Sequence, residues 1–378
     1  MTIKPKLIYK LFIAVLLTQS ITANAGSPVK TLKKVGALLD TLSVKGVDRN
    51  YIDAPKEPWQ IIVKGNINQS DLKMRATGDI DIVSYKAEPR LKTEPSKYIG
   101  LWAGYRGYGL GYTINTGGDK GSYFTVGATG GSYGVNVRVH SFENNRPSFS
   151  FSTDFDDLIN EDIDLEEEEV ELEDPIRVHT VIADAYYLFN GKRFSYAAAY
   201  DQSVIQKKSA GSIMAGAMFY YGKIDYATKN NAELIYLMRG LGKVKLWQGS
   251  VGAGYAYNWV PVKGLLVNAM AMPMLTLVNR IKVYAFKTNV EDVMNQYEDD
   301  EYPSDEELLA QYVITPLTRK SYNSGIAVNF DARISVTYNF GRYFVNAYGQ
   351  FNNFRYTHED NRGRLNDWFV NAAFGVRL

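Results

Sequence analysis

The side chains that could act as nucleophiles or general bases are few in this chain of 378 residues. It has three histidines and no cysteine, which excludes a cysteine nucleophile, a zinc–thiolate site and a disulfide framework. A serine hydrolase would need a serine and a histidine on one face. His140 and Ser141 are adjacent, but adjacent strand residues point to opposite faces. His179 begins another predicted strand and His358 lies in a short loop, so we predict no enzyme active site.

Two acidic segments could attract divalent cations, because carboxylate oxygens are ligands for Ca²⁺. Residues 154–174 hold 13 acidic residues and no basic one, and residues 291–307 hold 9 and no basic one. Neither segment has the fixed spacing of an EF-hand loop, and acidic blocks of this kind are usually solvated loops. The sequence therefore predicts no defined metal site and no cofactor, and it leaves open that these loops attract divalent cations.

Isolated charged residues recur inside stretches whose apolar and polar residues alternate. These residues are Arg138, Asp184, Arg193, Asp331, Arg333, Asp367 and Arg377. Each lies on the face opposite to the apolar one, so that all of them would meet inside a closed barrel. Two interpretations stay open: a constriction that selects solutes, and a structural network of paired charges that fills a narrow interior.

The strands that carry these charges can be compared across three tight turns, because the turn of a short hairpin fixes the register. Turns are predicted at Gly130-Gly131, Asn190-Gly191 and Phe340-Gly341. Across each turn the apolar faces of the two strands coincide. We therefore expect one continuous apolar surface opposite a polar one.

The stretch WQGSVGAGYAYNW, residues 247–259, indicates which surface meets water. One face has tryptophan at both ends, and the other holds small and polar residues. A soluble β-sandwich buries its apolar face in a core and needs no aromatic ends, whereas an apolar band between aromatic residues is typical of a transmembrane barrel. Only a closed barrel can cross lipid with strands. The residues predicted at the lipid interface are Trp247, Trp259, Tyr322, Tyr338, Tyr343 and Trp368.

The N-terminus predicts export. Residues 1–25 combine three lysines, a short apolar run and Ala23-Asn24-Ala25, which is typical of a cleaved signal peptide. Residues 26–58 are predicted to form a periplasmic or plug-like lead-in, and residues 59–378 the barrel, with acidic external loops at 143–177 and 288–320. The chain ends inside a strand on Leu378, much as outer-membrane barrels end, although usually on phenylalanine.

The fold class predicted is all-β, a transmembrane antiparallel up-and-down barrel. The expected strands are 59–74, 79–86, 98–115, 122–129, 132–142, 178–189, 193–202, 211–222, 246–259, 265–286, 322–339, 342–356 and 364–378. The up-and-down alternation breaks between 222 and 246, so a further strand is expected near Ala232, which gives 14 strands. Twelve is the alternative if two weak early strands lie outside the membrane.

The orientation follows from loop lengths, because short turns normally lie on the periplasmic side and long loops outside. The turns near 130, 190, 260–264 and 340 are then periplasmic, and both acidic segments are external. The same scheme places Lys207 and Lys208 in an outer turn.

Four stretches resemble a known family of outer-membrane barrels of Gram-negative bacteria. They are NYIDAPKEPW (50–59), GLWAGYRGYGLGY (100–112), RFSYAAAYDQSVIQKKSAGS (193–212) and GAGYAYNWVPVKGLLVN (252–268). The family is catalogued as domain of unknown function 4421, and the resemblance extends over residues 47–378. It implies an outer-membrane barrel and implies no activity, so that no functional residue is carried over from it.

The polar and charged inner face favours a passive or selective conduit for small solutes in the outer membrane. A structural or surface-binding barrel that uses the acidic external loops is the alternative, and a membrane lipid hydrolase is a remote one. The partners expected are outer-membrane lipid and, through the C-terminal strand, the barrel-assembly machinery. No nucleic acid partner is expected.

Overall fold

The computed structural model describes residues 46–80, 83–88, 90–117, 120–155, 164–169, 171–231, 234–235, 240–286, 317–358 and 361–378. The predicted signal peptide, most of the predicted lead-in and all of the second acidic segment lie outside the described residues. Among the described residues, no helix combines the length and the hydropathy of a membrane span.

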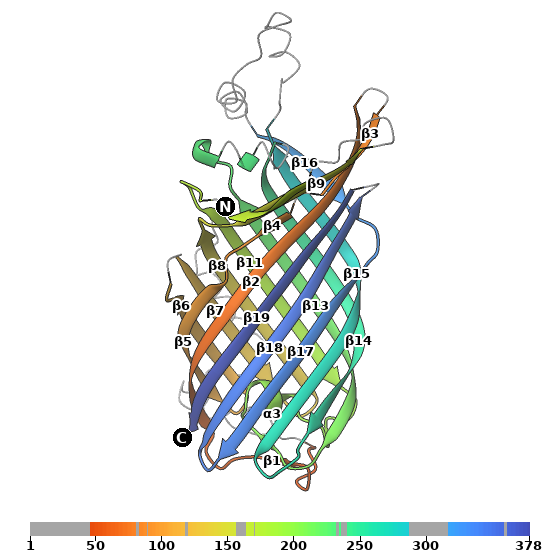
Figure 1. Ribbon diagram of the computed structural model, residues 1–378. Helices are drawn as coiled ribbons and strands as arrows, with labels where there is room; N and C mark the ends of the chain where they lie inside the picture. The colour runs from red at the N-terminus through yellow and green to blue at the C-terminus, as the bar shows by residue number, and fades with distance from the viewer. Residues whose placement is uncertain are drawn as a thin grey trace, which may run out of the picture. The chain divides into compact units, whose positions relative to one another are not determined.

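Twelve antiparallel strands of the described chain form a closed barrel (Figure 1). In chain order they are β2 (Trp59–Ile80), β5 (Ser96–Tyr105), β6 (Tyr108–Asn115), β7 (Gly121–Thr129), β8 (Tyr133–Asn144), β11 (Ile176–Leu188), β13 (Ala210–Asp225), β14 (Leu241–Trp259), β15 (Leu265–Ala285), β17 (Ala327–Phe340), β18 (Tyr343–His358) and β19 (Asn361–Arg377). β19 pairs with β2 and closes the wall. Trp59 and Leu378 exchange two backbone hydrogen bonds at this junction, of 3.1 and 2.9 Å. β16 (Thr318–Asn323) extends the pairing of β15 beyond the end of β17.

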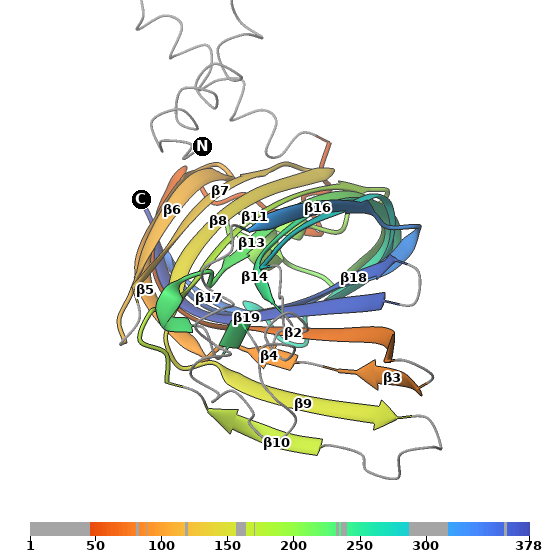
Figure 2. The ribbon, with the colours of Figure 1, turned by 90° about the horizontal axis from the view of Figure 1, so that it is seen from above.

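Further strands extend the sheet at the end of the barrel away from the C-terminus. β3 (Val83–Ala87) and β4 (Arg90–Lys92) pair with β2, and both also pair with β9 (Ser148–Phe155). β9 in turn pairs with β10 (Asp164–Glu169). Seen from above, β9 and β10 lie beside the ring of wall strands (Figure 2). The predicted external loop 143–177 therefore contains two strands of this outer extension.

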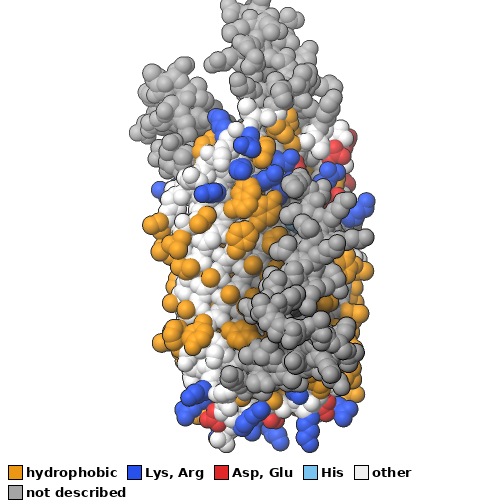
Figure 3. All heavy atoms as spheres, turned by 180° about the vertical axis from the view of Figure 1, so that it is seen from behind, with side chains coloured by type: hydrophobic (Ala, Val, Ile, Leu, Met, Phe, Trp, Pro, Cys, Tyr) orange, Lys and Arg blue, Asp and Glu red, His pale blue; other side chains and the backbone are white. Residues whose placement is uncertain are grey.

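The two faces of the wall have opposite character, as the alternation predicts. On β17, Val328 and Ile334 point outward and are 54% and 58% exposed, whereas Asn329 and Arg333 point inward and are 3% and 5% exposed. Figure 3 shows hydrophobic side chains over the middle of the wall, with Lys and Arg side chains gathered toward its two ends. A surface of this kind suits hydrocarbon rather than water.

The prediction of 14 strands is wrong, and the alternative of 12 is confirmed. The predicted strand 79–86 belongs to the outer extension, and 193–202 contains a helix. The predicted strand 98–115 is two strands, because Arg106 and Gly107 form a tight turn with φ values of 50° and 89°. Between β13 and β14 the described residues contain a 3-10 turn, η1 (Lys229–Asn231), and no strand. The alternation needs none there, since 193–202 does not cross the wall.

Residues 189–209, hereafter the inserted segment, fold into the barrel instead of pairing with β11. They contain helix α3 (Tyr196–Tyr200), which lies near the end that carries the C-terminus (Figure 1). Ser195 caps this helix by accepting a hydrogen bond from the backbone N–H of Ala198 at 3.1 Å. The run of three alanines favours a helix over a strand. The predicted hairpin at Asn190-Gly191 is therefore wrong, and β11 pairs with β13.

The chain leaves α3 through β12 (Ile205–Gln206), which pairs with β1 (Ile52–Asp53). Lys207 donates a backbone hydrogen bond to Tyr51 and therefore lies at the C-terminal end of the barrel. The expectation that Lys207 and Lys208 occupy an outer turn is wrong, because it depended on a strand at 193–202.

Candidate functional site in the barrel interior

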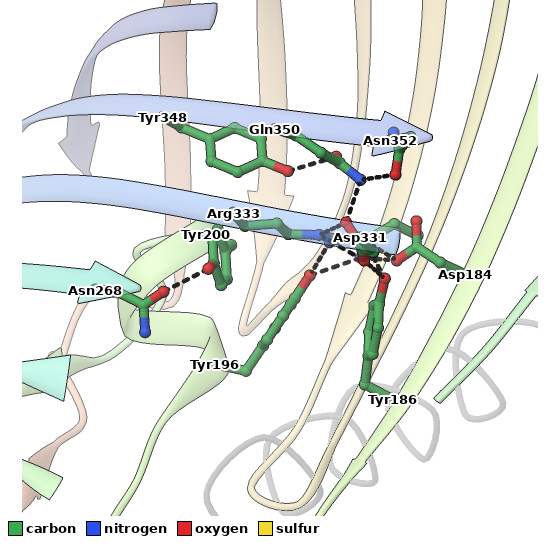
Figure 4. Close-up of polar contacts among 11 residues, drawn as sticks. Asp184, Tyr186, Tyr196, Tyr200, Asn268, Asp331, Arg333, Tyr348, Gln350 and Asn352 are labelled. Atoms are coloured by element: carbon green, nitrogen blue, oxygen red, sulfur yellow. Dashed lines mark hydrogen bonds and ion pairs between the residues drawn. The ribbon is translucent and has the colours of Figure 1, made fainter. Parts of the chain in front are cut away.

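A buried charge cluster lies inside the barrel (Figure 4). It consists of Arg333, Asp331, Asp184, Tyr186 and Tyr196. Arg333 Nη2 lies 2.9 Å from Asp331 Oδ2 and 3.3 Å from Asp184 Oδ1. Its Nη1 donates to the Tyr196 hydroxyl at 2.6 Å, and its Nη2 donates to the Tyr186 hydroxyl. Both carboxylates and the guanidinium are almost inaccessible to solvent.

Each member of the cluster is placed by a different part of the fold. Asp331 and Arg333 are two residues apart on β17, so that both face inward. Asp184 and Tyr186 do the same on β11, which faces β17 across the interior, and Tyr196 comes from α3. The cluster therefore connects two walls and the inserted segment through charged hydrogen bonds, which are stronger than neutral ones.

The structure brings together only part of the predicted charge network. Asp184, Asp331 and Arg333 meet in the cluster. Asp367 instead accepts a hydrogen bond from Ser70 Oγ at 3.2 Å. Arg193 is outside the interior: its side chain is 58% exposed and lies 3.8 Å from Asp48. Its membership of a lumen network is therefore wrong, because the strand expected at 193–202 is not formed.

Arg377 holds the inserted segment from below the cluster. Its Nη2 donates to the backbone oxygen of Gln202 at 2.8 Å and to Asn339 Oδ1 at 2.7 Å. Gln60 and Asn258 add hydrogen bonds to the backbone oxygens of Asp201 and Ser195. The inserted segment is thus fixed to the surrounding wall by hydrogen bonds.

Apolar side chains fill much of the remaining interior. One cluster includes Tyr196 of α3 together with Met214, Met272, Tyr220 and Phe354. A second, toward the outer end, includes Phe142, Ile176 and Val178 among others. A polar and charged inner face was predicted, and these methionines and aromatic residues show that part of that face is packed as a core.

A chamber with a volume of about 140 Å³ remains among these side chains. Its basic lining residues are Lys64 on β2 and Arg138 on β8, besides Arg333 of the cluster. Trp102, Tyr123 and Phe369 contribute aromatic surfaces. Tyr200, Asp201 and Gln202 of the inserted segment line it as well. Of the charge network predicted from the sequence, Arg138, Asp184 and Arg333 line this chamber.

Four glycines leave room for the Trp102 ring: Gly104 on the same strand, Gly109 and Gly111 on β6, and Gly127 on β7. A Cβ atom on Gly109, Gly111 or Gly127 would lie 2.7–2.9 Å from its indole ring, and one on Gly104 would lie 3.0 Å from its Nε1 atom. The glycine-rich stretch GLWAGYRGYGLGY therefore makes a flat strip of wall that accommodates one large ring. Trp102 and Lys64 were not predicted from the sequence, although glycines spaced two residues apart on one face were a visible signal.

The histidines are placed differently from one another. His140 faces inward, stacks on Tyr123 and is hydrogen bonded to the Tyr98 hydroxyl at 2.8 Å. His179 lies opposite Ser141 in the register of β8 and β11, and their Nδ1 and Oγ atoms are 2.6 Å apart. This Ser–His pair was not predicted from the sequence, where Ser141 was compared only with the adjacent His140. His358 is the last residue of β18, and its side chain is outside the described part.

No group of three or more histidine, aspartate or glutamate side chains among the described residues could hold a metal ion. Most of the acidic residues proposed to attract cations lie outside that part of the chain.

The closed wall, the apolar outer surface and the filled interior define a β-barrel of the outer-membrane type. The chain belongs to the family described as a domain of unknown function (DUF4421), whose profile matches residues 46–377. The predicted family is thereby confirmed. No curated protein sequence matches the chain.

Solved structures similar to the chain include several outer-membrane proteins. The β domain of the Bordetella autotransporter BrkA is 11% identical, with coverage of 85% of this chain and 100% of that one and a TM-score of 0.29. The outer membrane protein OprG from Pseudomonas aeruginosa is 10% identical, with coverage of 85% and 96% and a TM-score of 0.23. The toluene transporter TodX of Pseudomonas putida is 8% identical, with coverage of 86% and 90% and a TM-score of 0.24. Likeness at this level does not extend to function.

Proposed function

We propose that this protein is an outer-membrane conduit for small solutes, closed in this conformation by the inserted segment. The observation that carries the proposal is the position of α3, which lies inside the barrel and is fixed there by hydrogen bonds. Because hydrogen bonds rather than covalent bonds hold this segment, it can move out of the bore without any covalent change. The chamber next to this segment supplies a place where a solute would bind between the two ends of the barrel.

The barrel is wide enough to conduct solutes only when the segments and side chains that fill its interior move out of the way. Barrels of about eight strands are filled by their own side chains, whereas barrels of about 16 leave an aqueous channel. Twelve strands lie between these limits, so that the filling decides whether the bore is open. The inserted segment fills the periplasmic half, and the apolar cluster around Phe142 and Val178 fills the outer end.

Bilayer recording of three deletion variants tests the proposal. In one, a short Gly-Ser linker replaces residues 192–207; in another, residues 146–171 are removed; the third combines both changes. We expect the first to conduct more than the intact protein and the combined variant to conduct most. Circular dichroism and heat-dependent gel migration check that each variant is folded. A folded combined variant that never conducts would contradict the conduit.

A second function, hydrolysis of membrane lipid, is favoured by the Ser141–His179 pair. Both residues share the outward parity of Val139 and Val181 and lie toward the outer end of their strands, where lipid headgroups would be within reach. Ser141 Oγ would attack an ester carbonyl while His179 takes its proton, and the ester bond would break as His179 passes that proton to the departing alcohol. Water would then attack the acyl-serine, releasing the fatty acid and restoring the Ser141 hydroxyl. No described carboxylate contacts His179, so that the pair would act without an acidic third member.

Labelling with a fluorophosphonate probe tests this second function. We expect the intact barrel to be labelled and the Ser141→Ala variant to be unlabelled. Ser122→Ala is the matched control, because Ser122 lies opposite Ser141 on β7. Equal labelling of all three proteins, or of none, would contradict the hydrolase.

A further inference from the structure

The chamber holds two cations that are not neutralised by an ion pair. Lys64 Nζ donates one hydrogen bond, to Thr125 Oγ1 at 3.2 Å, and lies 5.4 Å from the centre of the Trp102 ring. The Arg138 guanidinium lies over the Phe369 ring at 4.7 Å. Neither Lys64 nor Arg138 forms an ion pair with a described carboxylate within 4.0 Å. Charges enclosed by protein are normally paired, because their separation from water is costly.

The polar groups left unsatisfied in the lining are donors. Arg138 Nη2 and Trp102 Nε1 are buried without a hydrogen-bond partner, and both residues line the chamber. A buried donor without an acceptor costs free energy, and an acceptor placed in the chamber would remove that cost. The chamber therefore lacks a negatively charged acceptor rather than a donor.

The acidic groups of the lining are already satisfied by the protein. Asp184 accepts from Asn136 Nδ2 at 2.9 Å and pairs with Arg333. Asp201 accepts from Thr129 Oγ1 at 2.6 Å and from the Ser203 backbone N–H at 2.7 Å. A cationic ligand would have to compete for carboxylates that are engaged, and it would face two free cations.

The remaining surface of the chamber suits a flat ring. The indole of Trp102 lies along the strip made by Gly109, Gly111 and Gly127. Phe369, whose ring lies under the Arg138 guanidinium, also lines the chamber. Aromatic faces pack well against other rings. A volume of about 140 Å³ admits only a small molecule.

We infer that the chamber binds a small organic anion that carries a flat ring, with Lys64 and Arg138 as its charge partners and Trp102 as its packing surface. The inference rests on the proposed function for the route by which the solute passes, and it deepens that function by naming the class of solute. Aromatic carboxylates have this chemistry.

Isothermal titration calorimetry on the folded barrel in detergent tests the inference with three probes. Benzoate carries both features, benzylamine has the ring with a positive charge, and acetate has the carboxylate without the ring. We expect benzoate to bind at least about tenfold more tightly than either of the others. We also expect Arg138→Gln and Lys64→Gln each to weaken benzoate binding by about tenfold or more.

Arg342→Gln is the matched control, because Arg342 is an exposed basic residue outside the inserted segment, and this variant should bind benzoate as the intact protein does. Lys64→Gln keeps the test decisive if Arg138→Gln fails to fold. Absence of benzoate binding, equal binding of benzylamine or acetate, or unchanged binding in both chamber variants would each overturn the inference. If benzoate binds but the deletion variants never conduct, the binding site in the chamber is supported and the conduit function is contradicted. If the variants conduct but benzoate does not bind, the conduit function is supported and the binding site is contradicted.

Discussion

Arg377, one residue before the C-terminus, donates from its Nη2 atom to the backbone oxygen of Gln202 at 2.8 Å. The same guanidinium reaches Asn339 on β17 and lies over the Phe344 ring at 4.6 Å. The strand that closes the wall therefore also holds the inserted segment. Arg377 therefore links the strand pairing that closes the barrel wall to the segment that fills the bore.

Arg377→Lys should loosen the inserted segment. Lysine keeps the charge but lacks the planar fork that reaches both acceptors at once. Because the chain has no cysteine, a cysteine placed at Ala198 in buried α3 reports exposure of the segment. We expect a water-soluble thiol reagent to label Cys at this position about tenfold faster in the Arg377→Lys background, which corresponds to roughly 1.4 kcal/mol.

Arg342→Lys serves as the comparison for this measurement. Arg342 is 67% exposed in its side chain and lies 3.2 Å from Glu57, at the same end of the barrel. Its replacement should leave the labelling rate unchanged. If both arginine variants label at the rate of the parent protein, Arg377 does not hold the segment.

Arg333→Met should be more destabilising than complete neutralisation of the cluster. The single change leaves Asp184 and Asp331 buried without their cation, and removal of one partner from a buried pair costs about 3–5 kcal/mol. Adding Asp184→Asn and Asp331→Asn removes those charges, so that the triple variant should recover most of the loss. Urea unfolding of the barrel in lipid measures the difference. A triple variant that is less stable than the single one would show that the charges themselves stabilise the fold.

Gly127→Ala should displace the Trp102 ring. The new Cβ atom would lie 2.9 Å from the indole, and overpacking of this kind costs about 1–3 kcal/mol. Adding Trp102→Phe should restore the free energy of unfolding, because the smaller ring leaves the room that is needed. Gly65→Ala is the control, since the nearest atom to its new Cβ outside the adjacent residues would be the Tyr98 backbone oxygen, 3.7 Å away. If both alanine variants lose the same free energy of unfolding and the double variant recovers none of it, these glycines do not serve to make room for the Trp102 ring.

The faces of the wall could be predicted from the sequence because period-two alternation and tight turns fix them. Ala128 pairs with Val135 across Gly130-Gly131, and Tyr338 pairs with Val345 across Gly341, as expected. The Ser141–His179 pair could not be found in this way. The connection between the two strands, residues 145–175, includes the first acidic segment, and a connection of that length does not set register.

The inserted segment was misread for a different reason. Phe194, Tyr196, Ala198 and Tyr200 alternate as strand residues do, yet the first three are buried in the interior and Tyr200 is partly buried there. Ser195 and the three alanines at 197–199 were the local sign of a helix. A helix of five residues is too short to show its own period. Trp102 was missed because the evidence for its role lies in glycines on other strands.

The outer extension should loosen in acid. Glu88, between β3 and β4, accepts a hydrogen bond from Lys73 Nζ at 2.6 Å and one from Arg75. The bond from Lys73, followed by that from Arg75, holds the pKa of Glu88 below its ordinary value. The stabilisation is therefore present above the unfolded pKa, roughly 4.3, and is lost as the pH falls through the lower folded pKa.

Hydrogen exchange of residues 83–92 between pH 7 and pH 3 measures this loss. Protection in the intact protein should exceed that of Glu88→Gln at neutral pH, and the two should converge in acid. A difference that stays constant over the whole range would show that Glu88 does not act through its charge.

Ile334→Arg tests whether the outer face of the wall meets hydrocarbon. Ile334 lies near the middle of β17 and is 58% exposed. An arginine at the bilayer midplane should cost about 2–4 kcal/mol, whereas Tyr338→Arg, close to the end of the same strand, should cost about 0–1 kcal/mol. In a water-soluble barrel both sites would be exposed surface, and both changes would stay within about 0.5 kcal/mol. Unfolding of the two variants in lipid vesicles therefore separates the two environments, because only a membrane makes the cost depend on depth.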